Sequence, residues 1–189
     1  MKKNLGVVRA VQPMPVLVVA AYDEEGRVNP LAAGWGMICN FDKIAVFIDL
    51  DHKTSECILK KKAFTVAVAD IDHMVETDFF GLVSGHDVPD KFEKSGLTAR
   101  KSEFVDAPVI EEYPITMECE LVEVFDNDNF EGVLGRIVNT VADEEVLDEN
   151  GKVEATKLNA LSFDCFTFKY MFENKFVGQG YSIGEKLNK

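Results

Sequence analysis

The alternation of apolar and polar segments predicts a series of β-strands in the first third of the chain. A continuous apolar run over residues 16–22 ends in the polar, glycine-containing segment 23–26, and apolar and small residues resume over 27–39. This arrangement is typical of two strands joined by a turn. Apolar runs over 44–50 and 63–69 predict a third and a fourth strand.

The segment between the third and fourth predicted strands favours a short helix. Residues 55–62 contain few strand formers and end in three lysines, so a helix is expected to begin near Thr54. The strand pattern stops again over residues 70–107, where scattered charges and glycines replace the apolar runs. We interpret this region as an insertion of short helices and loops over one end of a barrel.

The second half of the chain returns to strand-like patterns. Residues 115–121 alternate between apolar and polar positions, and residues 133–141 form another β-like run. The acidic stretch 143–151 separates them from a last segment rich in aromatic residues. Six or so strands with few long helices favour a closed antiparallel barrel, because a sheet hides its edges only by closure or by pairing with another chain. We therefore expect one mainly β domain over residues 1–189.

The charge balance limits the expected partners. Acidic residues outnumber basic ones by 33 to 20, giving a formal net charge of −13. Such a surface repels a phosphate backbone, which argues against nucleic acid as a partner. It also means that any phosphorylated ligand needs local lysines, backbone N–H groups or a helix start, and it slightly favours a basic protein partner.

The cysteines and histidines give little support for a metal site. The four cysteines lie far apart, with no paired spacing typical of zinc, iron–sulfur or thioredoxin chemistry, so we interpret them as free thiols. No two of the three histidines have metal-ligand spacing. The N-terminus lacks the apolar core of a signal peptide, and the run over 16–21 is too short to span a bilayer. A cytoplasmic protein that binds neither metal nor membrane is expected.

The most informative polar stretch is His52, Lys53, Thr54 and Ser55, at the predicted start of the helix. The first N–H groups of a helix lack partners and carry the positive end of the helix dipole, so they favour an anion such as phosphate. The side chains of Lys53, Thr54 and Ser55 add further donors. The alternative is an ordinary N-cap at Thr54 with Lys53 on a solvated turn.

The order of motifs along nearly the whole chain resembles the flavin reductase-like family of FMN-binding split-barrel proteins, especially its flavoredoxin-like members. The segments that carry the resemblance include Pro13-Met14-Pro15, Gly34-Trp35-Gly36-Met37, Lys53-Thr54, Ser84-Gly85, Asp90-Lys91-Phe92, Met117-Glu118-Cys119 and Leu134-Gly135-Arg136-Ile137-Val138. The resemblance implies a six-stranded antiparallel Greek-key split barrel with short peripheral helices. It further implies a homodimer, with FMN bound in a groove near the dimer interface.

The resemblance also implies roles for particular residues. The segment 34–40 would lie along the flavin ring, His52, Lys53 and Thr54 would hold the phosphate with a second charge from Lys91, and Ser84 and Gly85 would contact the ribityl chain or ring. No side chain is expected to act as a catalytic acid or base. The full set of expected cofactor-binding residues is Asn29, Gly34, Trp35, Gly36, Met37, Cys39, Asn40, His52, Lys53, Thr54, Ser84, Gly85 and Lys91.

Each of these assignments has a structural alternative. The glycines at 34 and 36 could mark a strand bulge, Trp35 could belong to the core, and Ser84-Gly85 could end a helix. Cys39 could be a small buried apolar residue. The chain also departs from the family pattern, since many flavin reductases carry serines or threonines where this sequence has Gly, Trp and Met, so backbone donors would have to replace their side-chain bonds to the ring.

The resemblance predicts an FMN-dependent oxidoreductase of the flavin reductase type, which takes electrons from NADH or NADPH and passes them to a flavin or another acceptor. The alternative is a flavoredoxin-like electron carrier that docks with redox proteins and has little turnover with nicotinamide. A third possibility is a barrel that has lost its flavin and serves as a binding module.

Overall fold

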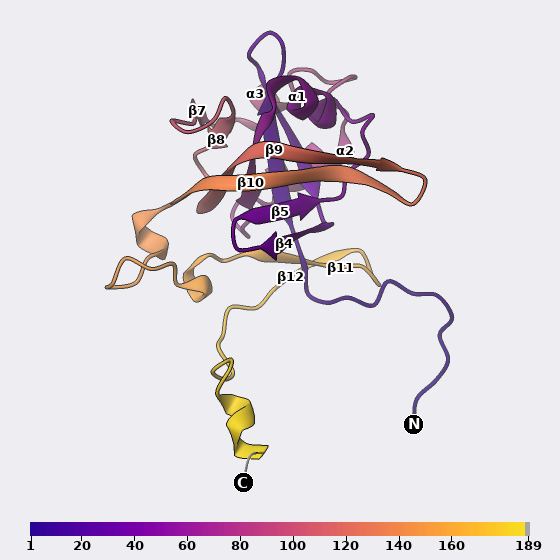
Figure 1. Cartoon of the computed structure of the whole chain (residues 1–189), viewed down its shortest axis with the longest axis vertical. Helices are drawn as coiled ribbons and strands as arrows, with labels where there is room; N and C mark the ends of the chain where they lie inside the picture. The colour runs from indigo at the N-terminus through magenta and orange to yellow at the C-terminus, as the bar shows by residue number, and fades with distance from the viewer. Residues whose placement is uncertain (188–189) are drawn as a thin grey trace.

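The computed structural model describes residues 1–187 and shows a mainly β fold (Figure 1). The largest sheet is antiparallel, with seven strands in the order β3-β2-β6-β9-β10-β5-β4. Their bounds are β2 (Leu17–Tyr22), β3 (Val28–Ala33), β4 (Gly36–Asn40), β5 (Lys43–Val46), β6 (Ala63–Val68), β9 (Ile115–Asn127) and β10 (Phe130–Ala142). Two small sheets complete the fold, formed by β7 (Ala99–Lys101) with β8 (Pro108–Ile110), and by β1 (Met14–Pro15), β11 (Leu161–Asp164) and β12 (Lys169–Phe172).

The helices are short and lie at the periphery of the sheet. The α-helices are α1 (Lys53–Lys61), α2 (Met74–Leu82) and α3 (Lys91–Ser95), and the 3-10 turns are η1 (Glu144–Val146), η2 (Ala155–Lys157) and η3 (Ile183–Leu187). The helix expected near Thr54 is confirmed as α1, which buries Thr54, Ser55, Cys57 and Ile58 and is followed by Lys62 as its C-cap in the left-handed conformation. Residues 70–107 contain α2, α3 and β7.

The split-barrel architecture expected from the sequence is confirmed, with seven strands in the main sheet rather than six. The expected strand over 27–39 is in fact two strands, because the chain leaves β3 after Ala33 and enters β4 at Gly36. β3 and β4 are the two edges of the sheet, so Gly34 and Trp35 link its opposite edges. The expected strand over 44–50 stops pairing at Val46, and Phe47 then donates its backbone N–H to the carbonyl of Trp35 at 2.8 Å.

The barrel interior is the main hydrophobic core. It contains side chains from β2, β3, β5, β6, β9, β10 and α1, with Phe64, Val66, Cys119 and Val133 fully buried. The alternation predicted over 115–121 is confirmed, since Met117, Cys119 and Leu121 all face this core. A second apolar cluster packs the outer face of β2 against α2, α3 and the β11–β12 hairpin. This second cluster fixes α2 and the hairpin beside the junction of β3 and β4.

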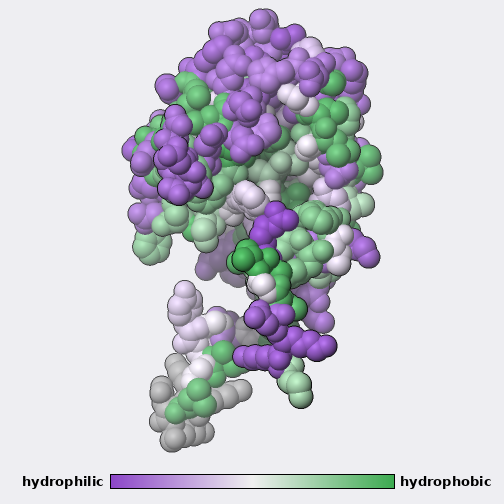
Figure 2. Space-filling model, turned by 90° about the vertical axis from the view of Figure 1, so that its right-hand side faces the viewer, coloured by the Kyte–Doolittle hydropathy of each residue, from purple (hydrophilic) through white to green (hydrophobic). Residues whose placement is uncertain are grey.

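Both ends of the described chain extend away from the barrel. The N-terminal segment and the segment after β12 leave the body on the side of β1, β11 and β12 (Figure 1). Hydrophilic side chains gather over the opposite end of the body, whereas apolar side chains are frequent toward the two arms (Figure 2). Within residues 1–187, none of the helices has the length and apolar character needed to cross a membrane.

Candidate cofactor-binding groove

Two adjoining cavities form a groove between the β3–β4 junction, the start of α1 and the end of α2. The larger cavity has a volume of about 460 Å³ and the smaller one about 220 Å³. Their walls share Leu31, His52, Gly81 and Leu82, so the two cavities lie next to each other. Cofactor sites typically have volumes of about 300–1,000 Å³. The groove is therefore large enough for a nucleotide-sized ligand.

The smaller cavity lies at the N-terminus of α1. His52 is the N-cap residue, its backbone is extended, and its side chain makes no capping hydrogen bond. Its neighbours Lys53 and Thr54 are the first helical residues and line the cavity. The alternative of Thr54 as the N-cap is therefore wrong. Since no side chain caps the helix, its first N–H groups are available to an anion.

Lys91 places a buried positive charge in the wall of the same cavity. The residue is only 1% exposed, and its Nζ donates one hydrogen bond, at 3.2 Å, to the carbonyl of Val83. It forms no ion pair with any residue of the described chain. Burial lowers the pKa of Lys91 to about 8, because the protein interior disfavours the charged form. A buried ammonium with a single neutral partner is costly, so a phosphate in this cavity fits the residues present.

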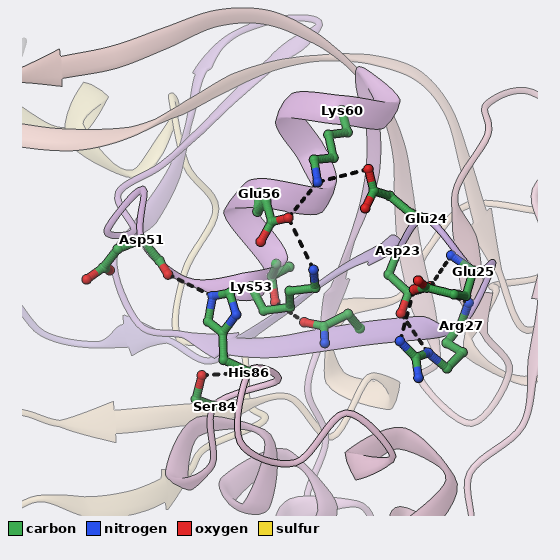
Figure 3. A network of polar contacts seen from close by, with 12 residues as sticks. Asp23, Glu24, Glu25, Arg27, Asp51, Lys53, Glu56, Lys60, Ser84 and His86 are labelled. Atoms are coloured by element: carbon green, nitrogen blue, oxygen red, sulfur yellow. Dashed lines mark hydrogen bonds and ion pairs between the residues drawn. The ribbon is translucent and has the colours of Figure 1, made fainter.

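Lys53 contributes less free charge than its position suggests. Its Nζ lies 3.2 Å from Glu56, which also pairs with Lys60 at 2.6 Å. Lys60 in turn reaches Glu24 at 3.0 Å, and Figure 3 shows both ammonium groups converging on the Glu56 carboxylate. The charge of Lys53 is therefore shared with an acidic neighbour. Lys91 is the stronger candidate for a phosphate contact.

Asn29 contacts two residues that line the smaller cavity, Thr54 and Gly85. The hydroxyl of Thr54 donates to Asn29 Oδ1 at 2.7 Å, and both residues are buried. Gly85 packs against the same amide so closely that a Cβ atom there would lie 2.2 Å from Asn29 Nδ2. Gly85 is thus needed for the close approach of its loop, and the helix-end alternative is wrong because α2 ends at Leu82 with Val83 as its C-cap.

The loop that carries Ser84 and Gly85 is tied to the turn before α1. Ser84 Oγ accepts the backbone N–H of His86 at 3.1 Å, and His86 Nε2 lies 3.1 Å from the carbonyl oxygen of Asp51 (Figure 3). Ser84 and Gly85 both line the smaller cavity. These contacts join the two loops that border the smaller cavity. The carboxylates of Asp49 and Asp51 and the His52 imidazole also lie within 4.8 Å of one another at the exposed edge of this turn.

The larger cavity is mainly apolar. Residues 31–35, Phe47, Ile48 and Leu82 line one part of it, and the β11–β12 hairpin contributes Phe163, Phe168 and Tyr170. The Phe47 ring packs against the rings of Phe125 and Phe130, with centroid distances of 6.0 and 5.7 Å. Trp35 is 55% exposed, so the alternative of a core tryptophan is wrong. Apolar walls of this kind suit a planar ring system.

The structure brings eight of the expected residues together in the groove, and Asn29 supports them. The eight are Gly34, Trp35, His52, Lys53, Thr54, Ser84, Gly85 and Lys91. Gly36 and Met37 instead line a neighbouring apolar cavity, where a Cβ atom on Gly36 would meet Leu17 Cδ1 at 2.6 Å. The small size of Gly36 is therefore explained by packing within the barrel.

Cys39 and Asn40 lie at the exposed end of β4 and line neither cavity of the groove. The alternative of Cys39 as a buried apolar residue is wrong, because its side chain is exposed. All four cysteines are free thiols, as expected. The cofactor-binding roles expected for Cys39 and Asn40 remain predictions. Among the residues of the larger cavity that the sequence did not indicate for the site, the polar or titratable ones are Arg9, Asp49, Asp78, Cys165 and Tyr170.

Comparisons with known proteins agree with this geometry. The family profile described as "Flavin reductase like domain" matches residues 9–158. Flavoredoxin of Desulfovibrio vulgaris (Miyazaki F) is 30% identical, with a TM-score of 0.92 over 97% of this chain and 100% of that chain. Flavoredoxin from Methanosarcina acetivorans is 25% identical, with a TM-score of 0.88 over 98% of this chain and 100% of that one.

A protein of Escherichia coli (strain K12), YddH, is 28% identical over 153 residues, which cover 78% of this chain and 80% of YddH. The matched profile runs from the N-terminal segment to the loop after β10. It covers the residues that line the smaller cavity and the β3–β4 junction. The chain therefore belongs to the flavin reductase like family.

Proposed function

We propose that this protein binds FMN in the groove and passes electrons from NADH or NADPH through the flavin to a flavin or another acceptor. The observation that carries the proposal is a groove of two adjoining cavities, with the buried Lys91, which has no acidic partner among the described residues, at its polar end and apolar walls at its other end. A molecule with a terminal phosphate and a planar ring matches both ends. Family membership and the two flavoredoxin neighbours support the same cofactor.

FMN, when bound, supplies the two-electron chemistry, so the side chains have to bind, orient and shield it. The first N–H groups of α1 and the Lys91 ammonium hold the phosphate. The backbone of Gly34 and Trp35 and the rings of Phe47 and Trp35 confine the planar end. No side chain of the groove has to transfer a proton for electrons to enter the cofactor.

Rapid mixing of the FMN-loaded protein with NADH and with NADPH tests the oxidoreductase proposal. We expect the flavin absorbance to bleach with a rate constant in the range of about 1–1,000 per second that is typical of enzymes. Free FMN at the same concentration is the control, and it should bleach far more slowly. A protein that binds FMN but bleaches only with a reduced protein partner would instead be an electron carrier, the alternative that the flavoredoxin likeness favours.

We further propose that the protein acts as a homodimer. The edge strand β4 and the turn after it expose large apolar side chains, with Met37 63%, Ile38 55% and Phe41 105% exposed. Exposed apolar groups on an unpaired sheet edge are typical of a surface that meets another chain. Trp35 and Phe47 line both the groove and the apolar cavity next to β4, so the second copy would cover the ring end. Sedimentation that gives a monomer with bound FMN would contradict this proposal.

A further inference from the structure

The apolar end of the groove contains a fixed carboxylate that the binding of a phosphate and a ring does not explain. Asp78, on α2, lines the larger cavity, as does Tyr170 on β12. The Tyr170 hydroxyl donates a hydrogen bond to Asp78 Oδ1 at 2.7 Å. This bond joins two elements 92 residues apart in the sequence. The hairpin thus holds the Asp78 carboxylate in place in the cavity wall.

Nothing within the described chain neutralises this carboxylate. Asp78 forms no ion pair with residues 1–187, and its only side-chain hydrogen bond comes from the neutral Tyr170. The other charged or titratable groups of the wall are Arg9, on the exposed N-terminal segment, the Cys165 thiol, and Asp49 and His52, whose side chains lie 3.8 Å apart at the turn before α1. Asp78 is thus an acidic group at the ring end of the groove, in contrast to the cationic phosphate end.

Tyr170 is suited to the role of a permanent donor. Burial raises the pKa of its phenol, and the neighbouring Asp78 raises that pKa further, because a phenolate would lie beside a carboxylate. The phenol therefore stays protonated at neutral pH and keeps its hydrogen bond to Asp78. The Asp78 carboxylate thereby lines a cavity whose other walls are mainly apolar, and such walls screen a charge less than water would.

Building on the proposed FMN site, we propose that Asp78, positioned by Tyr170, lowers the reduction potential of the bound flavin. Reduction adds negative charge to the ring, and a fixed carboxylate in the same low-dielectric cavity disfavours that charge. Oxidised FMN then binds more tightly than reduced FMN, and this ratio of affinities sets the shift in potential. The consequence is a flavin that gives up its electrons more readily to its acceptor. Asp78 acts through charge and Tyr170 is a positioning residue.

The test replaces Asp78 by asparagine and measures the flavin potential by spectroelectrochemistry. Asp78→Asn removes the charge but keeps an oxygen that can accept the Tyr170 bond. We expect the binding of reduced FMN to improve about tenfold relative to oxidised FMN, which for a two-electron couple raises the potential by about 30 mV. Asp72→Asn is the matched control, since it removes one exposed charge two residues ahead of α2 and should leave the potential unchanged.

Tyr170→Phe separates charge from packing. It leaves the Asp78 charge in place and removes a donor that partly offsets it, so the potential should stay the same or fall. A rise equal to that of Asp78→Asn would overturn the proposal, as would an Asp78→Asn variant whose potential does not rise or which no longer retains FMN. Titration of the unmodified protein with FMN comes first. Failure of the flavin to bind there would overturn the proposed function instead.

Discussion

Replacing Lys91 by methionine is expected to weaken the binding of FMN about 30-fold while leaving the binding of riboflavin unchanged. Lys91 is buried in the wall of the smaller cavity and has no acidic partner in the described chain. A hydrogen bond between charged groups contributes about 1.5–3 kcal/mol, and about 2 kcal/mol corresponds to a factor of about 30 in affinity. Riboflavin lacks the phosphate, so its affinity reports only the ring and the ribityl chain.

Fluorescence titration of both ligands into Lys91→Met measures the two affinities directly. Lys53→Met is the matched control, because it removes a lysine from the same cavity whose charge is already shared with Glu56 at 3.2 Å. Its effect on FMN should be smaller. An equal loss of riboflavin and FMN in Lys91→Met would contradict a phosphate contact and would indicate a change in the shape of the groove. The unliganded variant should unfold no more easily, since an unpaired buried charge becomes apolar.

The pH dependence of binding gives a second measure of the same contact. Because the pKa of Lys91 is lowered to about 8, the unliganded protein loses this charge as pH rises through that value. FMN affinity should therefore fall between about pH 7 and about pH 9.5, a range in which the phosphate stays a dianion. The unfolded lysine titrates near pH 10.4, so the unfolded state binds more protons in this window and the stability of the unliganded protein should rise with pH. Both trends should disappear in Lys91→Met.

Local signals in the sequence predicted much of the fold. The start of α1 followed from the change in composition after residue 52, and the strand alternation over 115–121 matches the side chains of β9 that face the core. The break at Gly34 and Trp35 could not be read from the pattern, because apolar and small residues run through it without interruption. It arises from pairing, since β3 and β4 lie at opposite edges of one sheet.

Some residues of the candidate site could likewise be predicted from local sequence, whereas others depend on the tertiary fold. His52, Lys53 and Thr54 could be predicted because helix starts attract anions wherever they occur. Lys91 and Ser84 came from the family resemblance, since a lysine at the start of a short polar helix looks solvent-exposed in sequence. The hydrogen bond between Asp78 and Tyr170 depends on how the β11–β12 hairpin packs against α2. The hydrophobic pattern of the sequence does not predict this packing.

The second large effect is expected from Gly132→Ala, which should lower the free energy of unfolding by about 2–3 kcal/mol, as severe overpacking does. A Cβ atom on Gly132 would lie 2.3 Å from the carbonyl oxygen of Val46 and 2.9 Å from Phe47 Cα. Both atoms belong to the backbone, so no side-chain rotation relieves the contact. The backbone there has little freedom to retreat, because the N–H of Phe47 is bonded to the carbonyl of Trp35 at 2.8 Å.

The same substitution should also displace Phe47 and Trp35, which both line the larger cavity of the groove. Gly132→Ala should therefore bind riboflavin and FMN more weakly by the same factor, unlike Lys91→Met, because the damage lies at the ring end. Urea unfolding and flavin titration measure the two effects. Gly180→Ala is the control, because a Cβ atom at Gly180 meets nothing within 4 Å. A Gly132→Ala variant with full stability and unchanged flavin affinity would show that the backbone after β5 can yield, and that the β3–β4 junction does not fix the ring end of the groove.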